Sequence, residues 1–435
     1  MRRLLTIVCA LSIVALMAMP ALAEVQNIKI SGGIDIRAIA RDNMAPSDSG
    51  AGRALGTFAE TTTQDLYNSV VTLNVDADLT DNVAAHIGLF NERDWGVTGA
   101  GIWSNSAYIT LKEMMYSPLT VVAGRTSVVI ADGLVVGDGV TNENTGGLLA
   151  AAELSPQNEF DTIHAILDYD PLTLIIGTLK LAEGLAGTFG DDIDGYLVDG
   201  IYKFEDYNAV LDTYLVAAHY ASPGVGLTGP DGTSNKTCDV YALATRLTME
   251  PTEGLMLDAG IAIQSGDYMT SRTVGVADRG LDAMAFNVGL DYAVDAEYSP
   301  KVGVKYIYRS GDSGDGVGDF EGWLPLAEGQ VLSVIVDPNT NTNSFNLNAS
   351  IVPADRLTLG VDVWFFNLAK ALATQTAAMS TKKDVGTEID LALKYAYTED
   401  VSMGLTLAYF MPGDYYRNGF DKTATEIIGS VGVKF

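Results

Sequence analysis

The sequence predicts an all-β protein: a transmembrane, antiparallel, up-and-down β-barrel of about 18 strands. Three observations predict this fold. About eighteen stretches of the chain alternate apolar and polar residues with period two, which is the period of a β-strand. The connectors between these stretches are alternately short and long, and the last stretch ends on Phe435 at the C-terminus.

The first residues have the pattern of a secretory signal. Arg2 and Arg3 form a charged start, residues 4–19 an apolar middle and residues 21–23 (Ala-Leu-Ala) a small-residue cleavage site. We therefore expect two parts, a signal peptide over residues 1–23 and an outer-membrane β-barrel over residues 24–435.

Cysteine content excludes a disulfide framework. Cys9 lies inside the predicted signal, so the exported chain keeps only Cys238. No motif around Cys238 indicates a catalytic thiol.

The charge balance excludes some classes of function. The chain has 26 basic and 55 acidic residues, and loss of the two signal arginines leaves 24 − 55 = −31. This excess of negative charge argues against nucleic-acid binding and against a soluble enzyme with an acidic substrate. Although 48% of the residues are hydrophobic, no apolar run of about 18 residues follows the signal, which excludes helical membrane spans.

Period-two alternation accounts for the hydrophobicity. Residues 343–352 (NSFNLNASIV) place four apolar side chains on one face and polar side chains on the other. The same period recurs in residues 71–78, 357–365, 388–395 and 426–435. Such stretches can cross a membrane as tilted strands, which need about 9–11 residues.

The connectors distinguish a membrane barrel from a soluble sandwich. Eight are short: 80–82, 116–118, 169–171, 205–208, 250–254, 294–299, 353–356 and 399–400. Nine are long: 41–64, 92–103, 130–160, 181–193, 221–239, 267–281, 311–342, 367–384 and 411–424. Short periplasmic turns, long external loops and an even strand number are typical of outer-membrane barrels. Residues 119–128 and 210–220 are poorly phased, and residues 330–336 could form an extra strand or a loop hairpin, so the count could differ by two.

The bilayer determines which face points where. Only a closed sheet pairs every backbone group without an edge, so the apolar faces must point outward and the polar faces must line a wet interior. Tyrosines near strand ends are typical of the aromatic girdles of such barrels, although a strand-forming role explains any one of them equally well. They are Tyr202, Tyr220, Tyr306, Tyr308, Tyr395, Tyr397 and Tyr409.

Several short motifs occur in a recognisable order. They are 107–111 (AYITL), 118–121 (PLTV), Gly124-Arg125, Gly133, 137–139 (GDG), 160–161 (FD), 310–312 (SGD), 386–391 (GTEIDL) and 410–415 (FMPGDY). In this order the chain resembles the alginate-export outer-membrane proteins. The resemblance implies an eighteen-stranded monomeric barrel that passes a polysaccharide or a smaller hydrophilic solute. It also implies a basic conduit, but of that arginine pattern only Arg125 can be placed, and Thr126 follows it instead of the usual glutamine.

The inward phase of the strands indicates a lumen of mixed charge. The predicted solute-pathway bases are Arg37, Lys112, Lys203, Arg246, Lys305, Arg309 and Lys394 from strand phase, and Arg125 as the resemblance implies. The predicted acids are Asp35, Asp76, Asp78, Asp199, Asp258, Asp362, Glu388 and Asp390. Charges of both signs across a narrow pore favour hydroxyl-rich or zwitterionic solutes over a polyanion. The alternative is that these residues pair with one another and only stabilise the wall.

Two long loops suggest further roles. Asp312, Asp315, Asp319 and Glu321 lie among glycines and are weak candidates for a divalent-cation site, because they lack EF-hand spacing and a solvated loop explains them better. Residues 131–159, including Asn142, Glu143 and Asn144, form a loop long enough to fold inward and narrow the pore.

Catalysis is the competing class. His86, His164 and His219 lie in strand-like sequence without a nucleophile elbow or zinc spacing, which favours a lumen or interface position for each. We therefore predict an outer-membrane passive channel for saccharides or other small hydrophilic solutes, with polysaccharide export as the family-implied case. It needs no cofactor, no metal and no nucleic acid, and its partners are outer-membrane lipid and the solute. The alternatives are a barrel hydrolase or a structural or adhesin barrel.

Overall fold

The computed structural model describes residues 27–44, 58, 63–97, 101–137, 154–182, 192–221, 237–269 and 277–435. The predicted signal peptide lies outside the described residues. Within them no helix is long and apolar enough to span a membrane.

Eighteen strands make up the described chain. The first nine are β1 (Asn27–Asp42), β2 (Thr63–Thr80), β3 (Val83–Asp94), β4 (Trp103–Leu111), β5 (Leu119–Ser127), β6 (Glu159–Asp168), β7 (Leu172–Ala182), β8 (Ile193–Phe204) and β9 (Ala209–Tyr220). The others are β10 (Cys238–Thr252), β11 (Leu255–Met269), β12 (Arg279–Ala293), β13 (Lys301–Arg309), β14 (Thr342–Ala354), β15 (Leu357–Asn367), β16 (Asp384–Ala396), β17 (Val401–Pro412) and β18 (Ala424–Lys434). A single 3-10 turn (Glu205–Tyr207) joins β8 to β9.

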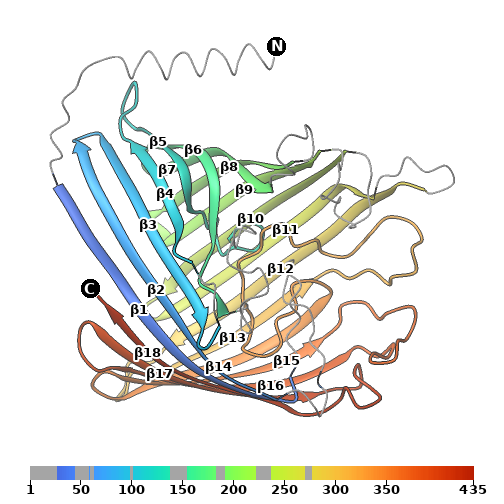
Figure 1. Cartoon of the computed structure of the whole chain (residues 1–435). Coiled ribbons are helices and arrows are strands. Elements are labelled where there is room, and N and C mark those ends of the chain that lie inside the picture. The colour runs from blue at the N-terminus through green and yellow to red at the C-terminus, as the bar shows by residue number, and fades with distance from the viewer. Residues whose placement is uncertain are drawn as a thin grey trace.

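The strands form one closed antiparallel sheet. Each strand pairs with its neighbours in sequence, and β1 also pairs with β18, from Gly33 opposite Lys434 to Asp42 opposite Thr425. Figure 1 shows the blue first strand beside the red last strand, where the ring closes. The barrel prediction and the count of eighteen are confirmed. Residues 330–336 form no strand.

The connectors alternate as predicted. Short turns join β2 to β3, β4 to β5 and every second pair after them, and long loops join the other pairs. One boundary differs: β4 ends at Leu111, so the turn to β5 spans residues 112–118 and includes Lys112.

The outer face of the barrel is apolar along its middle. Ile34, Ile87, Ile163 and Leu391 are exposed there at 43–62% of their surface, together with the other apolar residues of the same phase. In a bilayer this face contacts lipid chains, which is the arrangement that the alternation predicted.

The inner face differs from the prediction in two regions. On β13, β15 and β17 the inward residues Ile307, Trp364, Phe366 and Phe410 are buried in a cluster with the β13–β14 loop. The expectation of a uniformly polar interior is wrong for β7 to β12, whose inner face carries Leu179, Leu197, Val216 and a set of alanines. The alanines are Ala218, Ala242, Ala244, Ala262, Ala283 and Ala285. These side chains stay dry because two loops fold into the barrel and pack against them.

Candidate functional site

The loop after β5 turns into the lumen. Leu134, Val135 and Val136 are at most 2% exposed and belong to the cluster formed with the inner face of β7 to β12. The backbone N–H of Ile130 donates to the carbonyl of Val136 across 3.0 Å, which closes a compact turn. The inward course expected from loop length therefore holds for residues 128–137, whereas Asn142, Glu143 and Asn144 lie outside the described residues.

The loop between β13 and β14 meets this turn inside the barrel. The N–H of Gly137 donates to Ala327 across 2.8 Å, and the N–H of Gly329 donates to Gly133 across 2.9 Å. A Cβ on Gly329 would lie 2.5 Å from the carbonyl carbon of Gly137, so only glycine permits this approach. The two loops thus form one continuous constriction in the lumen.

Polar wall residues hold the β13–β14 loop through its backbone. Gln264 on β11 makes two hydrogen bonds to the backbone of Leu324, one as donor (2.7 Å) and one as acceptor (2.9 Å). The Glu388 carboxylate on β16 accepts from the N–H groups of Ile335 (2.7 Å) and Val336 (2.9 Å). Because buried backbone donors need partners, these contacts specify one position of the loop.

A buried contact between an arginine and a glutamate adds a third attachment. Arg309, at the end of β13, contacts the Glu328 carboxylate and donates to the Gln330 side chain across 2.8 Å and to the Pro338 carbonyl across 2.5 Å. Burial raises the pKa of Glu328 to about 8, and the Arg309 guanidinium offsets this only in part.

Register places most of the predicted solute-pathway residues on the inner face. Several of them pair with one another: Arg37 donates to Asp35 across 2.7 Å, and Arg246 contacts Asp258 through two nitrogens. Arg246 also lies 3.9 Å from Asp132 of the first loop, a residue that the sequence did not single out. The others on this face are Lys203, Lys305, Arg309, Lys394, Asp76, Asp78, Asp199, Asp362, Glu388 and Asp390.

Two of the predicted bases lie elsewhere. Lys112 lies in the turn after β4 instead of on a strand. Arg125 stands opposite Asp161 on β6, and it shares the outward phase of Ile163, two residues further along that strand. Its Nη1 lies 3.5 Å from the Asp161 carboxylate. Arg125 was placed from the family pattern and not from strand phase, which is why the prediction failed.

The acidic loop residues make contacts inside the loop and with β12 and the segment between β15 and β16. Asp312 lies 3.3 Å from Arg279 and accepts from the Gly314 N–H, and Glu321 contacts Lys370. Asp315 and Asp319 accept backbone N–H groups of Val317 and Gly280. Among the described residues no group of three or more His, Cys, Asp or Glu side chains could hold a metal ion.

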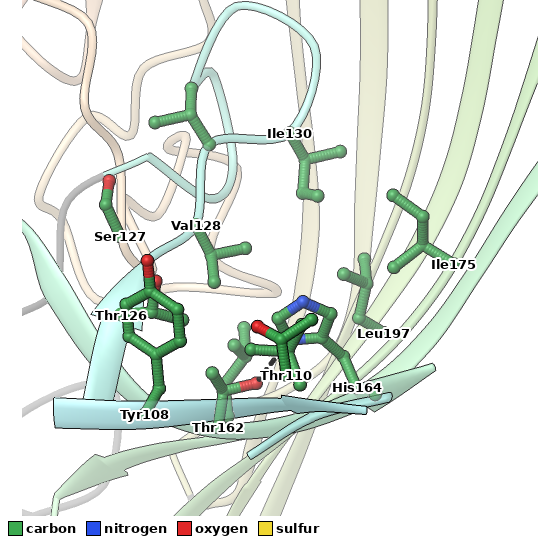
Figure 2. Close-up of a pocket in the computed structure, with 14 residues that line it drawn as sticks. Tyr108, Thr110, Thr126, Ser127, Val128, Ile130, Thr162, His164, Ile175 and Leu197 are labelled. Atoms are coloured by element: carbon green, nitrogen blue, oxygen red, sulfur yellow. Dashed lines mark hydrogen bonds between the residues drawn. The ribbon is translucent and has the colours of Figure 1, made fainter. Parts of the chain in front are cut away.

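A recess of about 390 Å³ opens beneath the infolded loop. Its wall is formed by β4 to β8, and Figure 2 shows Thr110, Thr162 and His164 rising from the strands toward Val128 and Ile130 of the loop. Tyr108 and Thr126 add two further hydroxyl groups at one side. Among the described residues the lining contains no Asp, Glu, Lys or Arg, which is unusual for a chain with 19% charged residues.

The three histidines occupy different places. His164 lines the recess, with its Nδ1 3.2 Å from the Thr162 hydroxyl. His219 on β9 is paired with Asp194 on β8 and Asp239 on β10, and its Nδ1 is 2.5 Å from the Asp239 carboxylate. His86, on the inner face, contacts both Asp76 and Ser106. No local motif could have indicated this last contact, because the three residues are on three strands.

Comparisons with known proteins agree with the fold. The chain is similar to the crystal structure of Pseudomonas aeruginosa OpdQ, with 13% identity, a TM-score of 0.58 and coverage of 95% of this chain and 99% of that chain. Pseudomonas aeruginosa OprD gives 11% identity, a TM-score of 0.56 and coverage of 95% and 97%. Pseudomonas aeruginosa OccK2 (OpdF), solved in complex with glucuronate, gives 12% identity, a TM-score of 0.57 and coverage of 94% and 98%. At such identities the likeness shows the fold alone.

The family comparison is more specific. A search of curated proteins finds no match. The family model described as "Alginate export" matches residues 208–430, just over half of the 435 residues. The chain therefore belongs to the alginate-export family and is a porin-like β-barrel of the bacterial outer membrane.

Proposed function

We propose that this barrel is a monomeric passive channel for saccharides or other small hydrophilic solutes. One observation carries the proposal: eighteen strands close into a ring whose inner face carries charged residues such as Asp76, Lys305 and Lys394, around a constriction made by two infolded loops. Barrels of this size enclose more space than their own side chains fill. Passage through such a channel requires no cofactor and no chemical step.

The recess beneath the loop supports hydroxylated solutes. It combines an apolar floor, including Ile175 and Leu197, with the hydroxyl groups of Tyr108, Thr110 and Thr162. A sugar ring has one apolar face and a hydroxyl edge, so both kinds of surface can be matched. The uncharged lining supports a neutral solute over a polyanion.

Export of a polysaccharide is the second candidate. The family match favours it, and the glucuronate bound to OccK2 shows that a barrel of this fold accepts a uronate. The acidic side chains near Arg246 oppose it, because Asp132 and Asp258 both face that arginine.

Planar-bilayer recording tests the proposal. The refolded protein, residues 24–435, should conduct ions, and neutral saccharides should interrupt the current at lower concentration than uronate oligomers of equal length. Stronger interruption by the uronates would favour polyanion export. Absence of any conductance in correctly refolded protein would refute the channel.

Two arginine variants test the pathway. Arg246→Ala should raise the cation-to-anion permeability ratio, because it leaves Asp132 and Asp258 unpaired in the lumen. Arg125→Ala is the matched control, because Arg125 and its cross-strand partner Asp161 have the outward phase. It should leave the permeability ratio unchanged. Equal effects of both substitutions would contradict this assignment of the pathway.

A further inference from the structure

Three polar side chains on adjacent strands form a chain of hydrogen bonds on the inner wall. The Asp76 carboxylate on β2 lies 2.7 Å from Nδ1 of His86 on β3. Nε2 of the same imidazole lies 2.9 Å from the Ser106 hydroxyl on β4. Acid, imidazole and hydroxyl thus follow one another in the order that nucleophilic serine catalysis requires.

The two contacts determine the imidazole tautomer. An ionised carboxylate only accepts hydrogen bonds, so Asp76 places the ring proton on Nδ1. Nε2 then carries the lone pair, and the Ser106 hydroxyl donates to it. The ring plane is also supported, because His86 stacks on Tyr108 with ring centroids 4.8 Å apart and an interplanar angle of 19°. This arrangement places the base correctly to take the serine proton.

The backbone around Ser106 leaves room for the group. Gly88 lies opposite both Asn74 and Ser106. A Cβ at Gly88 would lie 2.3 Å from the Ser106 hydroxyl and 3.0 Å from the Asn74 carboxamide oxygen. Glycine therefore clears the space in which the serine hydroxyl and the carboxamide meet. The β3–β4 register also shifts beside Ser106, between its pair with Gly88 and the pair of Leu89 with Ser104, and such a bulge re-aims a side chain.

The position of the group restricts the substrate. The lipid-facing side chains of β3 are Ile87 and Leu89, which have the opposite phase to His86. The group therefore faces the lumen, and the Asp76 side chain is 48% exposed there. Tyr108, which stacks on His86, is also part of the lining of the uncharged recess (Figure 2). A water-soluble ester fits this place, whereas a membrane lipid does not reach it.

We propose that Ser106, His86 and Asp76 form a lumenal esterase site for short acyl esters of hydroxylated solutes. The Ser106 oxygen bonds to the ester carbonyl carbon while its proton passes to Nε2 of His86. The Asn74 carboxamide, turned so that its NH2 group replaces its oxygen at the site, donates to the resulting oxyanion. The carbon–oxygen bond to the alcohol then breaks, and the alcohol leaves with the proton from His86. Water, deprotonated by His86, attacks the carbonyl carbon of the acyl-serine. The bond from that carbon to the Ser106 oxygen breaks, the carboxylic acid leaves, and Nε2 of His86 returns the proton to Ser106.

Covalent labelling tests the nucleophile. Refolded full-length mature protein is treated with diisopropyl fluorophosphate, and the modified residue is located by mass spectrometry. We expect one adduct, on Ser106, together with hydrolysis of p-nitrophenyl acetate above the rate of the buffer. Ser106→Ala should abolish both, and Asp76→Asn should slow hydrolysis by roughly 10²- to 10⁴-fold. Asn74→Ala should slow it by roughly 10²- to 10³-fold, the effect of losing one oxyanion donor.

A matched variant controls for folding. Ser104→Ala changes a serine of the same strand that pairs with the lipid-facing Leu89 and whose hydroxyl donates to the Ser106 carbonyl and not to His86, and it should keep full activity and labelling. No adduct on Ser106, or equal hydrolysis by wild type and Ser106→Ala, would overturn the proposal. Conductance is measured on the same samples, so a channel without esterase activity refutes only this inference, and an esterase without conductance refutes only the channel.

Discussion

The inner faces of β1 to β4 and of β7 to β12 share one strand geometry but differ in composition and in exposure to the lumen. Along β1 to β4 the inner face carries charged and hydroxylated side chains such as Asp35, Arg37 and His86, which remain partly exposed to the lumen. Along β7 to β12 the inner face is alanine-rich, and the infolded loops make it dry. The difference shows that an inward position does not by itself mean a wet position. An inward side chain packs in a dry cluster where a loop covers it and lines the solute pathway where no loop does.

Replacing Glu388, which holds the β13–β14 loop, should have the largest effect on loop stability and channel current. Glu388→Leu removes the acceptor for two buried N–H groups, which costs roughly 1–3 kcal/mol for each group. We expect the amides of Ile335 and Val336 to lose protection in hydrogen exchange, and single-channel currents to become larger and noisier. The same substitution at Asp362, which faces the lumen from β15, is the control and should leave both amides protected. Unchanged protection in Glu388→Leu would mean that apolar packing alone holds the loop.

A larger side chain on the covered inner face of β7 to β12 tests the comparison directly. Ala242 is fully buried beneath the loops, so Ala242→Phe should destabilise the packed state by about 1–3 kcal/mol. Ala84→Phe places the same side chain on the inner face of β3, opposite Asp78, and should change stability by less than about 0.5 kcal/mol. Urea unfolding in detergent measures both. Similar losses would show that the two walls are equally packed.

Docking of the β13–β14 loop inside the barrel should depend moderately on pH and should weaken as pH rises. The pKa of Glu328 is raised by burial to about 8, so the docked loop holds a proton that the undocked loop releases. Docking is therefore strongest below the ordinary pKa of glutamate and weakens as pH rises through about 8. A 5-fluorotryptophan NMR signal from Trp323, which is buried in the same loop, should broaden over this range.

Glu328→Gln should make that signal independent of pH. Glu321→Gln changes a carboxylate of the same loop whose side chain is 56% exposed, and it should keep the wild-type response. A wild-type signal that sharpens with rising pH would contradict the assigned sign.

The smallest change in stability is expected from a substitution on the exposed inner face of β1 to β4. Asp35→Asn removes one partner of a partly exposed ion pair at the lumen surface, so stability should change by less than about 1 kcal/mol. Ion selectivity should shift toward anions, because Arg37 then lacks its carboxylate partner. Reversal potentials across a salt gradient measure the shift. A change in the hydrogen exchange of residues 335–336 would indicate that the two walls are coupled.

Strand periodicity was enough to predict the architecture because the bilayer permits few solutions. Residues 343–352 can hide their apolar face only against lipid or a second layer, and the alternation of short and long connectors favours lipid. The same reasoning placed Arg246, Asp258 and Glu388 on the inner face. It failed at Lys112, which lies in the turn after β4, and it was not applied to Arg125, which was assigned from a family pattern.

The sequence by itself determined the strands, their order and their outward faces, because those features depend on neighbouring residues and on the membrane. Only the tertiary structure decided which inner residues are dry, since the covering groups come from loops far away in sequence, as Ala327 does for Gly137. The joining of Asp76, His86 and Ser106 likewise depends on strand register, which brings side chains 10 and 20 residues apart within hydrogen-bonding distance. Register and loop packing are long-range contacts, and no local pattern encodes them.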